Sequence, residues 1–295
     1  MFDLRYHVAS LAAVFLALII GILVGVGISG KGFVSDSERR LFNERIADLK
    51  SERDAARQHS ADLTRSQRAA QTFVADAYPA LMAGRLAGLR VALVFAGSED
   101  GRVRSLVEQA LDDAGGNQPL RTRALKLPID LPSLRRALAK RPALAALTTK
   151  KRVGELGRRL GAEYVSSGDN ALWRLVSANL VEEQSGKGGP PVDAVVIART
   201  VVPQAGATAR FLAGFYAGLA AAGVPAIGVE RTSDNATSVP TFAKHDLSTV
   251  DDLDTQAGRL SLVLLLAGAE PGQYGVKKAA KDGVLPAIPV TSAGG

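Results

Sequence analysis

The chain has 295 residues, enough for one large domain or two medium ones with a sizeable core. Hydrophobic residues make up 47% and aromatic residues only 5%, which favours helices and parallel strands over an aromatic-rich β-sandwich. The absence of cysteine excludes disulfides, a cysteine nucleophile, a thiolate metal site and an iron–sulfur cluster. A formal net charge of +7 favours anionic partners without choosing between lipid, polymer and nucleic acid.

Residues 1–30 are predicted to be a membrane anchor. Val8–Ile28 contains no charged residue and, as a helix, would be about 31 Å long, which matches the hydrocarbon thickness of a bilayer. A cleaved signal peptide is the alternative, because Gly27 and Ser29 are small residues as at a cleavage site. The apolar core of a signal peptide is usually only about 7–15 residues long, however, so we expect an uncleaved, single-pass anchor.

The charges that flank this span indicate its orientation only weakly. Arg5 precedes it, and Lys31, Arg39 and Arg40 follow it. The positive-inside rule alone would therefore place the rest of the chain in the cytoplasm, by a small margin.

Gly25–Gly32 matches two phosphate-binding patterns, G-x-G-x-x-G and most of G-x-x-x-x-G-K-[ST]. A phosphate loop follows a short strand and opens an amphipathic helix, whereas here a long apolar run precedes and polar residues follow. We therefore assign these glycines to the membrane helix. Gly21 and Gly25 form G-x-x-x-G, which lets two helices approach closely in lipid; the alternative is that glycine is simply frequent in membrane spans.

Residues 36–76 are predicted to form a coiled-coil stalk. The stretch is polar, contains no Gly or Pro, and carries a half-apolar seam with a seven-residue repeat. Such a seam needs a partner helix, so we expect a homo-oligomer; a lone helix lying on the main domain is the alternative. The seam residues are Phe42, Ile46, Leu49, Ala56, Leu63 and Ala70.

Residues 85–290 are predicted to form an α/β domain, with a mainly parallel, Rossmann-like sheet covered on both faces. The pattern alternates between buried strands and amphipathic helices with short connections. A loop or sub-domain boundary is expected at 185–191. Strands are expected at 89–97, 121–127, 192–199, 224–230 and 247–252, and helices at 101–116, 131–140, 151–162, 169–184, 207–222 and 255–268.

No catalytic motif is visible in the sequence, so we expect neither an enzyme nor a cofactor. His245 is the one histidine of the globular part and is expected in an exposed loop. Ser98 or Asp100 is expected to cap the helix that follows. An acidic group could hold a hard cation through oxygen ligands, but capping of the next helix by Asp252 or Asp254 is the favoured interpretation. This group consists of Asp246, Asp251, Asp252 and Asp254.

Basic residues are concentrated between Arg135 and Arg159, where Glu155 is the one acid. Such a surface could meet anionic lipid headgroups or an acidic cell-wall polymer, or it could be a set of ordinary solvated helix faces. Nucleic acid is not expected as a partner, because no aromatic residues are interleaved with the charges.

Several segments, spread over nearly the whole chain, form a recognisable combination in a fixed order. They are Arg5, His7, Ser10–Leu18, Ser248–Thr255, Gly258–Gly268, Gln273–Ala280 and Leu285-Pro286. In these segments the chain resembles the MctB-like copper transporter family. The resemblance implies an actinobacterial-type envelope protein that takes part in copper homeostasis, is described as a channel-forming efflux component, and has its body outside the cytoplasm.

The residue chemistry supports the membrane part of this resemblance better than the metal part. Copper(I) prefers thiolate and thioether ligands, yet the chain has no cysteine and only two methionines, Met1 and Met82. A single span encloses no pore, so transport would require an oligomer. A non-transporting envelope scaffold, whose α/β domain binds a protein or an anionic surface, is therefore the alternative function.

Overall fold

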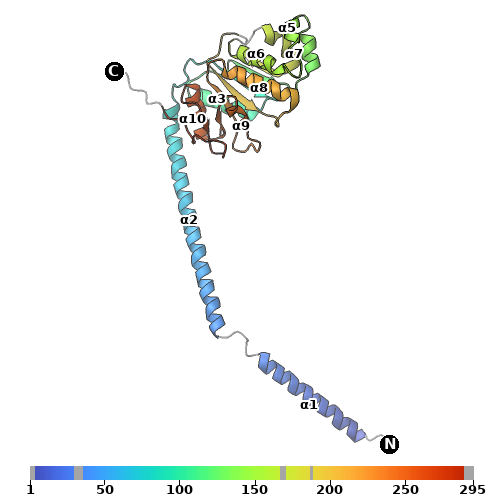
Figure 1. Ribbon diagram of the computed structural model, residues 1–295. Helices are drawn as coiled ribbons and strands as arrows, with labels where there is room; N and C mark the ends of the chain where they lie inside the picture. The colour runs from blue at the N-terminus through green and yellow to red at the C-terminus, as the bar shows by residue number, and fades with distance from the viewer. Residues whose placement is uncertain (1–3, 30–35, 167–170, 187–188, 289–295) are drawn as a thin grey trace. The chain divides into compact units, whose positions relative to one another are not determined.

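The computed structural model describes residues 4–29, 36–166, 171–186 and 189–288. The chain divides into two compact units, residues 1–70 and residues 71–295, and we call the second unit the body. Figure 1 shows the elements in chain order. The Gly30–Gly32 end of the double glycine pattern lies outside the described residues.

Two long helices begin the chain: α1 (Leu4–Ser29) and α2 (Asp36–Met82). Within α1, Tyr6–Gly27 forms a 22-residue stretch of mean hydropathy 2.8 whose side chains are all exposed. This stretch is long and apolar enough to cross a bilayer. The last turns of α2 belong to the body, where Tyr78 and Met82 are buried in its core.

The body is built on one seven-stranded sheet of order β3-β2-β1-β4-β5-β6-β7. All neighbouring strands are parallel except β2 and β3. The α/β fold expected from the sequence is therefore confirmed. The strands are β1 (Val91–Ala96), β2 (Arg121–Leu125), β3 (Val181–Gly186), β4 (Ala194–Arg199), β5 (Ala226–Val229), β6 (Ser248–Val250) and β7 (Gln273–Tyr274).

Helices cover both faces of the sheet and enclose two hydrophobic cores. The end of α2 packs with α3 and α10 on one face, and α4, α6, α7, α8 and α9 pack on the other. The strands supply both cores because successive side chains point to opposite faces. The body helices are α3 (Gly101–Asp113), α4 (Leu131–Ala137), α5 (Pro142–Ala145), α6 (Val153–Ser166), α7 (Ala171–Leu180), α8 (Gly206–Ala220), α9 (Val239–Ala243) and α10 (Gln256–Leu266).

The helix expected over 169–184 is wrong in its second half. α7 ends at Leu180, and Val181–Gly186 forms β3, an antiparallel edge strand paired with β2. Its side chains beyond Val181 are exposed and include Glu182 and Glu183. Charged side chains are common on edge strands. The polar sequence therefore does not look like a strand, and the strand forms because the edge of β2 is open to pair with it.

Trp173 lies in the core between the sheet and helices α4, α6, α7, α8 and α9, which we call the second core. The side chain is fully buried, and its Nε1 donates a hydrogen bond to the carbonyl oxygen of Leu160 at 3.0 Å. Tyr164 and Phe215 pack around it with ring centroids 5.7 and 6.2 Å away. The guanidinium carbon of Arg123 lies 4.5 Å from the Trp173 ring centroid, a cation–π contact that stabilises a charge largely removed from water.

α6 and α8 cross with their backbones in contact, because both helices carry glycine at the crossing. A Cβ atom at Gly157 or Gly161 would lie 2.2 Å from a carbonyl oxygen of α8. A Cβ atom at Gly214 or Gly218 would lie 1.9 or 2.1 Å from a carbonyl oxygen of α6. These four positions therefore fix the distance between the two helices.

We expect Gly161→Ala to destabilise the body by about 1–3 kcal/mol, because the new methyl group would force α6 and α8 apart. The midpoint of urea unfolding of the full-length protein in mild detergent measures this effect. Gly101→Ala is the control, since no atom lies within 4 Å of a Cβ built there. Equal midpoints for the two variants would show that the crossing does not depend on close backbone contact.

Candidate functional site

A small crevice lies at the carboxyl edge of the sheet, where the strand order reverses direction. The chain runs from β1 to β2 on one side and returns to β4 on the other side of β1. Ligands of open α/β sheets bind beside such a reversal. The crevice has a volume of about 240 Å³ and is lined by the ends of β4 and β5, the start of α3 and the loop after β5.

The β1–β4 side of this edge is closed by direct contact between two loops. The Thr200 hydroxyl donates to the carbonyl oxygen of Ser98 at 2.6 Å. Gly97 has a φ of 119°, and a Cβ atom there would lie 2.5 Å from Val201 Cγ1. The loops that follow β1 and β4 are therefore held against each other beside the crevice.

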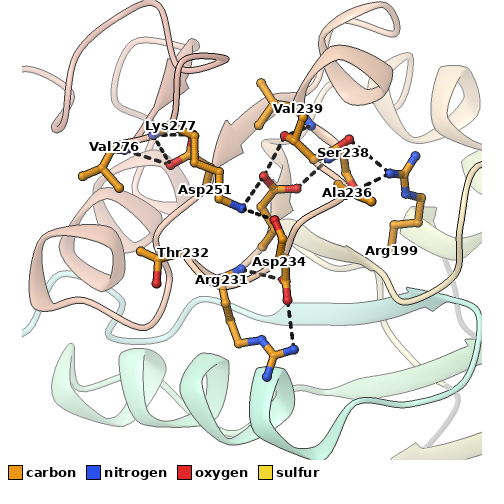
Figure 2. A network of polar contacts seen from close by, with 12 residues as sticks. Arg199, Arg231, Thr232, Asp234, Ala236, Ser238, Val239, Asp251, Val276 and Lys277 are labelled. Atoms are coloured by element: carbon orange, nitrogen blue, oxygen red, sulfur yellow. Dashed lines mark hydrogen bonds and ion pairs between the residues drawn. The ribbon is translucent and has the colours of Figure 1, made fainter. Parts of the chain in front are cut away.

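Arg231 ties the loop after β5 to the start of α3. Its Nη2 lies 3.2 Å from an oxygen of Asp100 and 3.0 Å from an oxygen of Asp234. The other oxygen of Asp100 accepts hydrogen bonds from the backbone N–H groups of Arg102 and Val103, which confirms Asp100 as the cap of α3. Figure 2 shows Arg231 reaching from its loop towards this helix.

A buried ion pair holds the same loop from the other side. Glu230 is 5% exposed and accepts hydrogen bonds from Lys277 Nζ at 2.9 Å, Ser238 N at 2.6 Å and Thr237 Oγ1 at 2.7 Å. Lys277 Nζ also donates to the carbonyl oxygen of Asp234 at 3.0 Å (Figure 2). A buried charge pair of this kind is stabilising only when its remaining hydrogen bonds are made, as they are here.

Sequence reasoning missed Glu230 and Arg231, and one available signal could have indicated them. Glu230 directly follows the apolar strand β5, so a charged side chain is placed where the sheet meets its loops. Asp100, Arg231 and Asp234 are paired with one another, whereas Arg199 donates to the carbonyl oxygens of Ala236 and Thr237. Their arrangement stabilises the loops and offers a small polar site without an evident acid–base pair among the described residues.

The four aspartates of the predicted acidic group have separate roles. Asp251 is fully buried and accepts hydrogen bonds from the backbone N–H groups of Val276 and Lys277 at 2.8 and 3.2 Å. Asp254 accepts one from Thr232 N at 2.7 Å, and Asp246 occupies a turn with a φ of 57°. In the described part of the chain, no three His, Asp or Glu residues are grouped as a metal site would require. These contacts favour the structural interpretation of the group.

The expectation that Asp252 or Asp254 caps α10 is wrong, because the cap is a neighbouring residue. Thr255 is the cap of α10, and its Oγ1 accepts a hydrogen bond from Gly258 N at 2.8 Å. The same hydroxyl donates to Asp252 Oδ2 at 3.0 Å. Asp252 thus orients the cap instead of forming it. Its Oδ1 is buried without a hydrogen-bond partner among the described residues, and burial raises the pKa of this carboxyl to about 6.

His245 is half-buried, so the expectation of an exposed loop residue is wrong. The turn at Asp246 brings its ring against Tyr216 of α8, with centroids 5.8 Å apart. Desolvation lowers the pKa of His245. Tyr216 belongs to the core, so the half-buried histidine packs against a core residue.

The predicted membrane and stalk residues lie on α1 and α2, as their sequence positions require. Gly21 and Gly25 have open space around a built Cβ atom. Phe42, Leu49 and Leu63 are 65%, 54% and 58% exposed. These apolar side chains therefore lie on the open surface of α2.

Nearly the whole chain matches a known protein family. The family model described as copper transport outer membrane protein, MctB, matches residues 1–285. The chain belongs to the MctB family. No individual curated protein matches the sequence significantly. The match confirms the resemblance seen in the sequence. MctB is a family of transport and envelope proteins and not of enzymes, and membership implies a copper transport envelope protein.

The described surface of this MctB protein offers no sulfur ligand for copper(I) as a substrate. Met82 is fully buried among apolar core residues, and Met1 lies outside the described residues. Copper(I) favours sulfur ligands, which the exposed residues of the body do not supply. The structure therefore gives no copper relay within the described residues of the body.

We expect Asp252→Asn to remove part of the pH dependence of stability. Folding raises the pKa of Asp252 from 3.8 to about 6. The protonated carboxyl therefore stabilises the folded protein fully when the pH is below the pKa of the unfolded chain, and this stabilisation is lost as the pH rises through the pKa of the folded protein. The asparagine keeps the shape and carries no charge. Thermal unfolding of the full-length protein in detergent, measured from about pH 4 to about pH 7, tests this expectation.

The variant should be at least as stable as the original protein at neutral pH, and its midpoint should change less across this range. Asp246→Asn, at an exposed position, is the matched control. Parallel curves for the original protein and Asp252→Asn would contradict the assignment of a raised pKa to Asp252.

Proposed function

We propose that this protein is a membrane-anchored, oligomeric envelope protein that takes part in copper homeostasis or efflux. The observation that carries the proposal is the family match, which begins at residue 1 and therefore includes the apolar helix α1 with the stalk and the body. In this proposal α1 remains attached as a single-pass anchor in contact with lipid. The body lies outside the cytoplasm, as the family's description as an outer membrane protein favours.

Oligomerisation through the first unit is the second part of the proposal. The Gly21–Gly25 face allows close helix contact in lipid, and the seam of α2 would cover Phe42, Leu49 and Leu63 against a second copy. Since the backbone of a single helix is satisfied internally and encloses no lumen, a channel would have to be assembled from several copies. Copper passage would then be a property of the assembly.

A non-transporting envelope scaffold is the second candidate function. It is favoured by the burial of Met82 and by the absence of soft ligands on the described surface of the body. In this alternative the anchored stalk positions the body, which binds a protein or an anionic surface.

We expect a strain that lacks this protein to accumulate copper and to grow poorly in raised copper. Complementation with the original chain should restore both properties, and Leu49→Asp should restore them poorly, because a buried charge in the seam opposes assembly. Leu41→Asp is the matched control: Leu41 is 64% exposed on the same helix but lies off the seam.

Copper accumulation and growth curves distinguish the two candidate functions. Unchanged copper content and tolerance in the deletion strain, together with defects in cell shape or envelope integrity, would contradict the copper function and support the scaffold.

We expect the full-length protein in mild detergent to be an oligomer and residues 71–295 to be a monomer, because the seam lies in the first unit. Light scattering coupled to size-exclusion chromatography measures both masses. Leu49→Asp should lower the mass of the full-length protein, and Leu41→Asp should leave it unchanged. A monomeric full-length protein would contradict assembly through α1 and α2.

A further inference from the structure

The positive charge of the chain is concentrated in residues 135–159, which we call the basic segment. It has nine Lys and Arg residues and one acid, Glu155, and thus a formal charge of +8. The whole chain carries +7, so all the remaining residues together carry −1. The nine basic side chains, all exposed, are Arg135, Arg136, Lys140, Arg141, Lys150, Lys151, Arg152, Arg158 and Arg159.

Little of this charge is neutralised within the body. Glu155 is shared by Arg158 Nε at 3.2 Å and Arg159 Nε at 3.1 Å, and these two guanidinium groups lower its pKa. The other seven basic side chains make no ion pair with any described residue. Arg210 of α8 adds a further cation beside them, since its Nη1 donates to the carbonyl oxygen of Lys150 at 3.1 Å.

The fold brings these charges to one part of the body. Arg135 and Arg136 lie on α4, Lys150–Arg152 form the turn that leads into α6, and Arg158 and Arg159 follow on α6 itself. α4 contacts α5 and α7, α6 contacts α7, and Figure 1 shows α5, α6 and α7 close together. Like charges held this close repel one another and destabilise the compact state, a cost that an anionic partner would remove.

The basic segment also borders a groove, which lies between α4 and the segment that follows it. Its volume is about 450 Å³. Two of its lining residues are arginines, whose guanidinium groups have the fork geometry that matches phosphate and carboxylate oxygens, and the apolar lining residues suit the carbon skeleton of a repeat unit. The groove is lined by Leu131, Pro132, Arg135, Arg136, Ala139 and Thr148.

We propose that the basic segment binds an acidic, phosphate-bearing polymer of the cell envelope. One repeat unit occupies the groove beside Arg135 and Arg136, and the next phosphates lie over Lys150–Arg152. A groove lined by both apolar residues and arginines suits a polymer chain better than the plane of a bilayer. Nucleic acid fits poorly because residues 135–159 contain no aromatic side chain on which a base could stack. This binding is independent of the proposed copper function.

The test uses the full-length protein in zwitterionic detergent and a fluorescently labelled long-chain polyphosphate as the probe. We expect saturable binding that weakens as sodium chloride is added, because salt screens exposed charges. The triple variant Lys150→Gln, Lys151→Gln, Arg152→Gln should weaken binding at low salt by about tenfold or more. Arg135→Gln with Arg136→Gln should also weaken it.

The matched control is Lys50→Gln, Arg57→Gln, Arg68→Gln, which removes the same charge from exposed positions of α2. It should leave the affinity unchanged. Undiminished binding by the first triple variant, an equal loss in the control, or no binding to the original protein would overturn the proposal. Binding to micelles that contain anionic lipid but not to polyphosphate would instead assign the surface to a membrane and would also overturn it.

Discussion

The body depends on the burial of β1 from both sides. This strand pairs with β2 and β4, and none of its six side chains is more than 2% exposed. Val91, Leu93 and Phe95 enter one core, while Ala92 and Val94 enter the other. Because both faces of a central parallel strand must be covered, helices are required on both sides of the sheet.

Much of this architecture could be predicted because the buried strands and amphipathic helices show a local hydrophobic pattern in the sequence. The strands at β1, β4 and β5 are short apolar runs, and α3 is amphipathic and begins at an aspartate cap. The edge strand β3 could not be predicted from its own residues, since its pairing partner is distant in the sequence. The local sequence pattern is enough to predict a buried strand or helix, whereas a polar edge strand forms only because a neighbouring strand pairs with it.

The crevice shows a similar division. The cap at Asp100 could be inferred from its position before an apolar helix, but the pairing of Glu230 with Lys277 joins residues 47 positions apart. Nothing in the local sequence of either residue indicates the other. The same is true of His245, whose burial follows from a turn that places it against α8. Long-range polar contacts are thus the part of the site that only the fold reveals.

Trp173 gives the second core a spectroscopic signature. It is the one tryptophan in the chain, and it is enclosed by Tyr164, Phe215 and the guanidinium of Arg123. Neither α1 nor α2 contains an indole, so intrinsic emission excited at the red edge of the protein band arises from the packing of α6, α7 and α8 alone. Fluorescence of the intact, detergent-solubilised chain therefore reports on the body without a label and is silent about the helices that precede it.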